Sequence, residues 1–226
     1  MKIKNLLPLS LQDFPGEIAC IVYIAGCNFR CFYCHNPELV NPEQIKKLKD
    51  ISEEEFFSFL DEKKEKLTGV VITGGEPCLY DKLYGFIKKI KEKGYKVKLD
   101  TNGTNPELLK KLIDGNLLDY IAMDIKASWK NYGKIVGVKA DIEKIKKSIE
   151  IIKKLPEYEF RTTVVPEIVE DFEEISEIGG KRFVLQQLRK EKMLKEYKGE
   201  PVKLEKMREI KKILEKGFDE VKIVNI

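Results

Sequence analysis

The chain has 226 residues, of which 42% are hydrophobic and 35% are charged, enough for a domain with a substantial core. Its 42 basic and 38 acidic residues leave a net charge of only +4, a balance that favours solvated helix faces over a nucleic-acid surface. No apolar run approaches the roughly 20 residues of a membrane span, and no long apolar stretch follows the first residues. We therefore expect a cytoplasmic protein with neither a nucleic acid nor a membrane as partner.

Apolar, β-branched runs alternate with charged, helix-like stretches along the chain. The capping box Ser52-Glu53-Glu54-Glu55 opens the first predicted helix, because its first and last side chains can satisfy each other's backbone donors. We predict strands at residues 18–25, 70–73, 96–101, 120–126, 160–165 and 182–186. We predict helices at residues 52–67, 81–93, 106–114, 141–155, 171–178 and 202–217, followed by a short closing strand or tail at 220–226.

The alternation of strands and helices predicts the fold class. Strands separated by helices are typical of βα units on a parallel sheet, so we predict an α/β fold. About six parallel strands are too few for a closed eight-fold barrel, and we expect a partial, open βα barrel. Because no linker, low-complexity segment or break in composition interrupts the chain, we expect a single domain over residues 1–226.

The most informative segment is Cys27-Asn28-Phe29-Arg30-Cys31-Phe32-Tyr33-Cys34, a C-x₃-C-x₂-C run with three thiols and no fourth. Thiolates are the usual ligands of iron–sulfur clusters, and three of them can hold three irons of a [4Fe–4S] cluster. The fourth iron is then open to a ligand that is not protein, and an open position distinguishes a reactive metal site from a structural one. The spacing therefore indicates chemistry at the metal.

Two other uses of these cysteines are weaker alternatives. A Cys₃His zinc site would need Cys34 and His35, which are adjacent, as two of its four ligands within nine positions, and that is sterically awkward. Disulfides do not suit an odd count of five cysteines in a chain with no signal peptide. Cys20 lies inside a predicted strand and is interpreted as a small buried hydrophobe, whereas Cys78 cannot alone ligate a second cluster.

Unusual residue clusters follow the predicted strands, where parallel βα folds place their sites. The first strand runs into Gly26-Cys27 and the second into Gly74-Gly75-Glu76-Pro77. The third ends in Asp100-Thr101-Asn102-Gly103 and the fourth in Asp124-Ile125-Lys126, and the fifth carries Arg161. Any one of these could be an ordinary turn, as Asn-Gly often is. Together on one rim they indicate a functional site.

These segments resemble a known family. The cysteine run, with an aromatic residue before its last cysteine, and Gly74-Gly75-Glu76-Pro77 resemble two motifs of radical S-adenosylmethionine (SAM) enzymes. Residues 26–37 and the upstream Asp13-Phe14-Pro15-Gly16 are similar to the activating enzymes of glycyl-radical enzymes, such as pyruvate formate-lyase and anaerobic ribonucleotide reductase. The resemblance covers the N-terminal two-thirds of the chain well and the rest loosely.

The resemblance implies a set of site residues. The three cysteines Cys27, Cys31 and Cys34 would ligate the [4Fe–4S] cluster, and SAM would chelate the fourth iron. Glycine carbonyls and Glu76 would face the methionine ammonium of SAM, Lys126 and Arg161 would offset its carboxylate, and Tyr33 to His35 would meet its adenine. The full implied set of SAM contacts is Tyr33, Cys34, His35, Gly74, Gly75, Glu76, Asp124, Lys126 and Arg161. Asp100 and Asp124 also resemble acidic positions that hold a monovalent cation.

One departure from the family pattern affects the choice of partner. Formate-lyase activase has a late histidine that reaches the cofactor, whereas His35 is the only histidine of this chain. Gln186, Gln187 or Arg189 would have to serve instead. The stretch Leu185-Gln186-Gln187 resembles the ribonucleotide reductase activases, so we expect an anaerobic ribonucleotide reductase as the protein substrate.

The implied reaction is a one-electron reductive cleavage of SAM that yields a radical able to abstract hydrogen from a glycine of the partner. A flavodoxin or ferredoxin would supply the low-potential electron. One alternative is a radical SAM enzyme acting on a small molecule such as a deazaguanine precursor. Such enzymes commonly need extra elements to close the barrel, and only about forty residues follow residue 186. A second alternative, a non-enzymatic iron–sulfur electron-transfer protein, would leave the other strand-end motifs without a purpose.

Overall fold

The computed structural model describes residues 1–224, so the last two residues of the predicted closing strand, 225–226, lie outside the described part of the chain. The described residues divide into two compact units, each built from several stretches of the chain. The first unit comprises residues 1–28, 38–121 and 144–157, and the second comprises residues 29–37, 122–143 and the chain from residue 158 onward.

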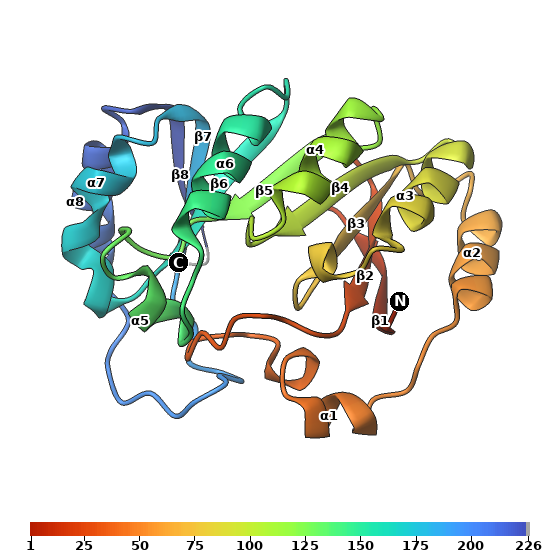
Figure 1. The fold of residues 1–226 in the computed structure, drawn as a ribbon, viewed down its shortest axis with the longest axis horizontal. Helices are drawn as coiled ribbons and strands as arrows, with labels where there is room; N and C mark the ends of the chain where they lie inside the picture. The colour runs from red at the N-terminus through yellow and green to blue at the C-terminus, as the bar shows by residue number, and fades with distance from the viewer. Residues whose placement is uncertain (225–226) are drawn as a thin grey trace. The chain divides into compact units, whose positions relative to one another are not determined.

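The sheet of the first unit begins with an antiparallel pair and continues with parallel strands (Figure 1). In order, the strands are β1 (Ile3–Ser10), β2 (Ala19–Ile24), β3 (Gly69–Gly74) and β4 (Lys96–Thr101). Among these four strands, β1 and β2 pair antiparallel, whereas the β2–β3 and β3–β4 pairings are parallel. The last residues of β2 and β3 are register partners, so the carboxyl ends of these parallel strands lie at the same edge.

The helices of the first unit start where the sequence provides a cap. The hydroxyl of Ser52 accepts a hydrogen bond from the amide of Glu55 (3.0 Å), which confirms the predicted helix start. Asn105 caps a second helix in the same way through the amide of Leu108 (3.1 Å). The helices are α1 (Pro42–Lys47), α2 (Glu53–Glu62), α3 (Leu83–Glu92) and α4 (Pro106–Asp114), with the 3₁₀ turn η2 (Pro77–Leu79).

Three elements cross the division between the units along the chain. The turn η1 (Pro37–Leu39) begins in the second unit and continues in the first. Strand β5 (Tyr120–Asp124) has its first two residues in the first unit and the rest in the second. Helix α6 (Ile142–Ile152) begins in the second unit and has most of its residues in the first.

The second unit contains a parallel three-stranded stretch with an aromatic core. Phe160 packs edge-on against Phe218, which in turn packs edge-on against Phe183. The strands are β6 (Tyr158–Val164), β7 (Gly180–Gln187) and β8 (Phe218–Val224), and α7 and α8 lie beside β7 and β8 in Figure 1. The helical elements are α5 (Tyr132–Val136), η3 (Pro166–Asp171), α7 (Phe172–Ser176) and α8 (Leu204–Leu214).

The predicted α/β fold with parallel strands is confirmed, and the sheet closes on itself in neither unit. The strand count of about six was wrong, because residues 1–224 contain eight strands. The sequence analysis missed β1, whose exposed Leu7 and Leu9 hide the alternation of a half-buried strand. It also missed α1 and α5, which are too short for helical periodicity. A single domain over residues 1–226 stays a prediction.

No helix within residues 1–224 has the length and apolar composition needed to cross a membrane.

Candidate active site

The carboxyl ends of β2 and β3 approach each other closely in the first unit. The amide of Gly75 donates to the carbonyl of Ile24 (2.8 Å), and the amide of Glu76 donates to the carbonyl of Gly26 (2.7 Å). A Cβ atom at residue 75 would lie 2.1 Å from the Gly26 oxygen, far inside van der Waals contact. Gly74 has a φ of +121°, a conformation that favours glycine. Both glycines are therefore needed where the end of β3 meets the start of the cysteine loop.

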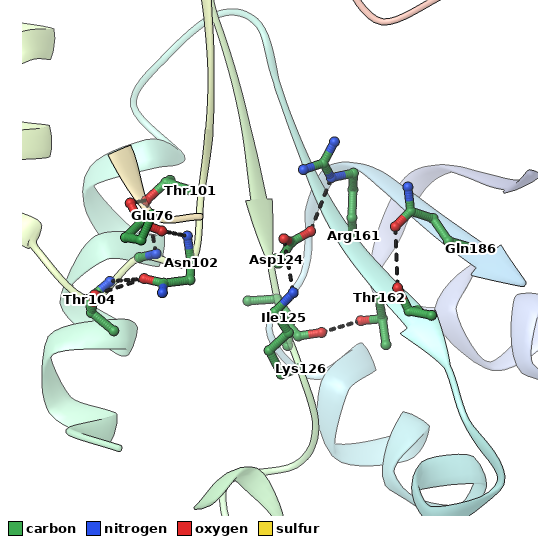
Figure 2. A network of polar contacts seen from close by, with 12 residues as sticks. Glu76, Thr101, Asn102, Thr104, Asp124, Ile125, Lys126, Arg161, Thr162 and Gln186 are labelled. Carbon is green, nitrogen blue, oxygen red and sulfur yellow. Dashed lines mark hydrogen bonds and ion pairs between the residues drawn. The ribbon is translucent and has the colours of Figure 1, made fainter. Parts of the chain in front are cut away.

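Glu76 is a buried carboxylate that joins the ends of β3 and β4 (Figure 2). Its Oε1 accepts hydrogen bonds from the amide of Cys78 (2.9 Å) and the hydroxyl of Thr101 (2.8 Å). Its Oε2 accepts a hydrogen bond from the amide of Asn102 (2.6 Å). Burial raises the pKa of the Glu76 carboxyl, and these hydrogen bonds offset part of that effect. The predicted contact between Glu76 and the methionine ammonium stays a prediction.

Three polar side chains form a closed ring of hydrogen bonds next to Glu76. Asn102 Nδ2 donates to Asn28 Oδ1 (2.8 Å), Asn28 Nδ2 donates to Thr104 Oγ1 (2.9 Å), and Thr104 Oγ1 donates to Asn102 Oδ1 (2.7 Å). Asn102-Gly103 is the turn that the sequence suggests, with a φ of +75° at the glycine. This ring is not predicted from the sequence. The one signal for it is the run of polar residues that directly follows the strand at 96–101.

Each carboxylate of the expected monovalent cation site has a cationic partner in its own unit. Lys98 Nζ donates to Asp100 Oδ1 (2.7 Å), and the Lys98 side chain is only 3% exposed. Asp124, in the second unit, pairs with two cationic side chains. The charge of both carboxylates is therefore offset by protein groups, and the cation site stays a prediction.

Asp124, Lys126 and Arg161 form one network between the end of β5 and the middle of β6 in the second unit (Figure 2). Lys126 Nζ lies 3.0 Å from Asp124 Oδ2, and Arg161 Nε lies 3.1 Å from Asp124 Oδ1. Burial disfavours the charge on Lys126, but the Asp124 carboxylate raises the Lys126 pKa well above its ordinary value. The two strands are fixed to each other by a hydrogen bond from the Thr162 hydroxyl to the Ile125 carbonyl (2.5 Å). The side chains of Lys126 and Arg161, two of the predicted SAM contacts, are thus both held by Asp124.

The cysteine loop provides three thiols, none of which forms a disulfide within the described residues. Cys27 belongs to the first unit, and Cys31 and Cys34 belong to the second. The latter two lie in one turn, in which the amide of Cys34 donates to the carbonyl of Cys31 (3.1 Å). Burial raises the pKa of the Cys31 thiol to about 11, and the positive charge of Lys126 acts in the opposite direction. Cys20 is fully buried in β2, as the sequence analysis expected.

Tyr33 and His35 lie on either side of Cys34 in the second unit. The Tyr33 ring is buried with its centroid 5.9 Å from Lys126 Nζ, and its hydroxyl has no hydrogen-bond partner among the described residues. Burial lowers the pKa of His35, and a hydrogen bond to the backbone of Arg189 opposes this shift. The segment after β7 therefore reaches the cysteine loop at His35.

The two glutamines at the end of β7 have different surroundings. Gln187 Nε2 donates to the carbonyl of Val202 (3.1 Å), so this side chain anchors the segment before α8. Gln186 Oε1 accepts a long hydrogen bond from Thr163 Oγ1 (3.5 Å). Which of Gln186, Gln187 and Arg189 takes the place of the late histidine stays a prediction.

The donor chemistry of the cysteine loop fits an iron–sulfur cluster. Three cysteine thiols within eight residues are the ligand type that [4Fe–4S] clusters take. A metal needs the thiolate form of its cysteine ligands; burial raises the pKa of Cys31, and the positive charge of Lys126 offsets part of this effect. Within residues 1–224, no three His, Cys, Asp or Glu side chains are gathered so that they could hold a metal ion. The assignment of Cys27, Cys31 and Cys34 as ligands therefore rests on their chemistry and spacing.

Comparison with known proteins places the chain among iron–sulfur enzymes. The model of the radical SAM superfamily matches residues 21–178. The chain is also 34% identical to a protein of Methanocaldococcus jannaschii that is provisionally named a glycyl-radical enzyme activating enzyme. This similarity extends over 99% of the chain and 96% of the relative.

Two other relatives match over shorter stretches. The pyruvate formate-lyase-activating enzyme of Clostridium pasteurianum is 34% identical over 54% of the chain and 53% of its own length. The 7-carboxy-7-deazaguanine synthase of Methanopyrus kandleri is 30% identical over 52% of the chain and 54% of its own length. The chain thus spans about half the length of these two relatives.

A solved structure supports the fold. A domain of the pyruvate-formate lyase-activating enzyme from Bacteroides vulgatus superposes with a TM-score of 0.56, at 17% identity, over 70% of this chain and 99% of that one. At such low identity the likeness concerns the fold alone, and it agrees with an α/β fold of parallel strands.

Proposed function

Because this chain belongs to the radical SAM superfamily, we propose that it is an activating enzyme that forms a glycyl radical on a partner protein. As a member of the superfamily it is an iron–sulfur oxidoreductase that uses a [4Fe–4S] cluster and SAM. The observation that carries the proposal is the similarity to the M. jannaschii relative, which extends over nearly the whole of both chains. A non-enzymatic electron carrier does not agree with membership of this superfamily.

When bound, the [4Fe–4S] cluster and SAM would supply radical chemistry by one-electron reductive cleavage of SAM. The protein binds and orients them. In this proposal the thiolates of Cys27, Cys31 and Cys34 hold the cluster. Lys126 and Arg161, already held by Asp124, offset the SAM carboxylate through charge-assisted hydrogen bonds. The remaining proposed SAM contacts are Tyr33, Cys34, His35, Gly74, Gly75 and Glu76.

The partner that we propose is an anaerobic ribonucleotide reductase, with a flavodoxin or ferredoxin as electron donor. Two features support this choice over formate-lyase activation. The chain has a single histidine, His35, so no late histidine is available to the cofactor. The end of β7 carries Leu185-Gln186-Gln187, which resembles the ribonucleotide reductase activases.

Electron paramagnetic resonance of the reduced, SAM-loaded enzyme mixed with the reductase encoded in the same genome tests the proposal. We expect a glycyl-radical doublet that requires SAM and disappears when the partner's glycine is changed to alanine. The matched control is the Cys31→Ala enzyme with the native partner, which should give no doublet. A native mixture that consumes SAM but leaves the partner without a radical would contradict the proposal.

A deazaguanine-forming activity is the second candidate, because 52% of this chain is 30% identical to the M. kandleri synthase. The two candidates differ in the size of their substrate. In the absence of any partner protein, turnover of a purine-like small molecule together with formation of deoxyadenosine would favour the synthase. An activase should instead turn over only when the glycine-bearing protein is present.

A further inference from the structure

The first cysteine of the loop is held on both sides by the ends of β3 and β4. Before it, the amide of Gly26 donates to the carbonyl of Leu39 (2.7 Å), and the carbonyl of Gly26 accepts from the amide of Glu76 (2.7 Å). After it, the side chain of Asn28 is a member of the hydrogen-bonded ring with Asn102 and Thr104. The loop is therefore fixed at the residues that immediately precede and follow Cys27.

Each side chain of the ring donates one hydrogen bond to the next member and accepts one from the member before it. Asn102 donates to Asn28, Asn28 donates to Thr104, and Thr104 donates back to Asn102, with donor–acceptor distances of 2.8, 2.9 and 2.7 Å. The amide of Thr104 also donates to Asn102 Oδ1 (3.1 Å), which fixes the orientation of the Asn102 side chain. Asn28 is exposed, whereas Asn102 is only 5% exposed, so the buried member determines where the exposed one lies.

Asn102 is itself anchored to the interior. Its backbone amide donates to Glu76 Oε2 (2.6 Å), and the same carboxylate is fixed by Thr101 and Cys78. A continuous path of hydrogen bonds thus leads from the buried Glu76 through Asn102 to Asn28. Its two hydrogen bonds join Asn102 to Glu76, 26 residues away in the sequence, and to Asn28, 74 residues away.

We infer that Asn102 is a positioning residue for the cysteine loop: acting through Asn28, it fixes the place and orientation of Cys27. The inference rests on the proposed function in that it takes Cys27 as a ligand of the cluster. Side chains that orient metal ligands through hydrogen bonds commonly change metal affinity by about 10- to 100-fold when they are removed. The same substitution should also loosen Cys27 when no cluster is bound.

The first experiment uses the protein without its cluster and measures iodoacetamide alkylation of each cysteine by peptide mass spectrometry. In Asn102→Ala we expect alkylation of Cys27 to become faster, while Cys34, the internal reference in the second unit, keeps its rate. This substitution retains the backbone amide that Glu76 needs. Asn105→Ala is the matched control, because it removes an amide side chain three residues away that caps α4 through Leu108 and donates to the carbonyl of Cys78.

A double-mutant cycle distinguishes positioning from general loosening of the fold. If Asn102 acts through Asn28, then Asn102→Ala should add little to the Cys27 rate in an Asn28→Ala background. Thr104→Ser, which keeps the ring hydroxyl, should behave as the native protein, and Thr104→Val should resemble Asn102→Ala. An unchanged Cys27 rate in Asn102→Ala, or a full further increase in the Asn28→Ala background, would overturn the inference.

The second experiment challenges the reconstituted protein with an iron chelator. Asn102→Ala should release its iron at a chelator concentration lower by about 10- to 100-fold than the native protein, with Asn105→Ala unchanged. Native-like retention of iron in Asn102→Ala would overturn the inference while leaving the proposed function intact. Native-like retention in Cys27→Ala would instead contradict the ligand assignment of the proposed function, and the alkylation results would still report on the ring.

Discussion

At the scale of single residues, Glu76 shows how a buried charge is kept in the fold. An ionised carboxylate without partners would be strongly destabilising in the interior. Here both carboxylate oxygens accept hydrogen bonds from groups at the ends of β3 and β4, which offsets the cost of burial. A substitution at this position therefore affects the local fold as well as any contact with SAM, and Glu76 is a poor choice for testing SAM binding alone.

Lys126 is a better residue for testing SAM binding. Its removal leaves Asp124 paired with Arg161, so no buried carboxylate loses all its charged partners. If Lys126 offsets the SAM carboxylate, Lys126→Met should lose about 1.5–3 kcal/mol of binding free energy, roughly 10- to 150-fold in affinity. Anaerobic calorimetry with SAM measures this. Lys147→Met, which removes an exposed ion pair with Glu107, should leave the affinity unchanged.

The content of iron after anaerobic reconstitution tests the cysteines. The native protein should hold about four irons and four sulfides, and replacement of any one of Cys27, Cys31 and Cys34 by alanine should abolish the iron–sulfur absorbance. Cys20→Ala and Cys78→Ala should retain it, because both of these thiols are fully buried and neither belongs to the cysteine loop. Loss of the cluster in Cys20→Ala together with its retention in Cys27→Ala would refute the assignment.

Some of these residues could be predicted from the sequence and others could not. The cysteines and Gly74-Gly75-Glu76-Pro77 are contiguous motifs, so spacing alone identifies them. Most partners of Glu76 and of Asn28 come from the end of β4 and the turn after it, up to 76 residues away, and depend on strand register. A turn signal such as Asn102-Gly103 does not indicate that its asparagine side chain is used elsewhere.

At the scale of elements, the contact between the ends of β2 and β3 can be tested with two glycines. Gly75→Ala would place a Cβ atom 2.1 Å from the Gly26 carbonyl oxygen, and the resulting displacement should destabilise the fold by about 1–3 kcal/mol or more. Gly85→Ala, at an exposed position in the first turn of α3 with no atom within 4 Å of the new Cβ, should instead stabilise it by about 0.4–1 kcal/mol. Urea unfolding followed by circular dichroism measures both, and equal effects of the same sign would contradict the close approach.

The N-terminus of α2 provides a second test at this scale. Ser52→Ala removes the hydroxyl that caps the helix and should cost about 0.5–2 kcal/mol of unfolding free energy. The matched control is Ser58→Ala, at an exposed position inside the same helix, where the change should stay within about 0.5 kcal/mol. If the two variants unfold at the same urea concentration, the cap does not stabilise the helix.

The long, periodic elements could be predicted, and their ends were less certain. The predicted boundaries of β4 and α4 agree with the structure, because a strongly alternating strand and a proline-started helix carry clear signals. The predicted helix at 52–67 is longer than α2, which ends at Glu62. The charged residues after Glu62 suit a helix surface in sequence, but nothing in their pattern marks the point where the helix stops.

At the scale of the whole molecule, each of the two units contains a network of polar contacts among residues that we propose for the site. Glu76 is bonded to Asn102 in the first unit, which contains Cys27, and Asp124 pairs with Lys126 and Arg161 in the second unit, which contains Cys31 and Cys34. Superfamily membership establishes the cofactors, whereas the substrate depends on relatives that differ in what they act on. The central claim is therefore that the enzyme acts on a glycine residue of a partner protein.

Transfer of a labelled hydrogen atom tests this claim most directly. The partner reductase is prepared with glycine deuterated at Cα and mixed with the reduced, SAM-loaded enzyme, and the deoxyadenosine that forms is analysed by mass spectrometry. Our account predicts deoxyadenosine one mass unit heavier, in amounts equal to the glycyl radical formed. Unlabelled deoxyadenosine, formed at the same rate with or without the partner, would contradict it.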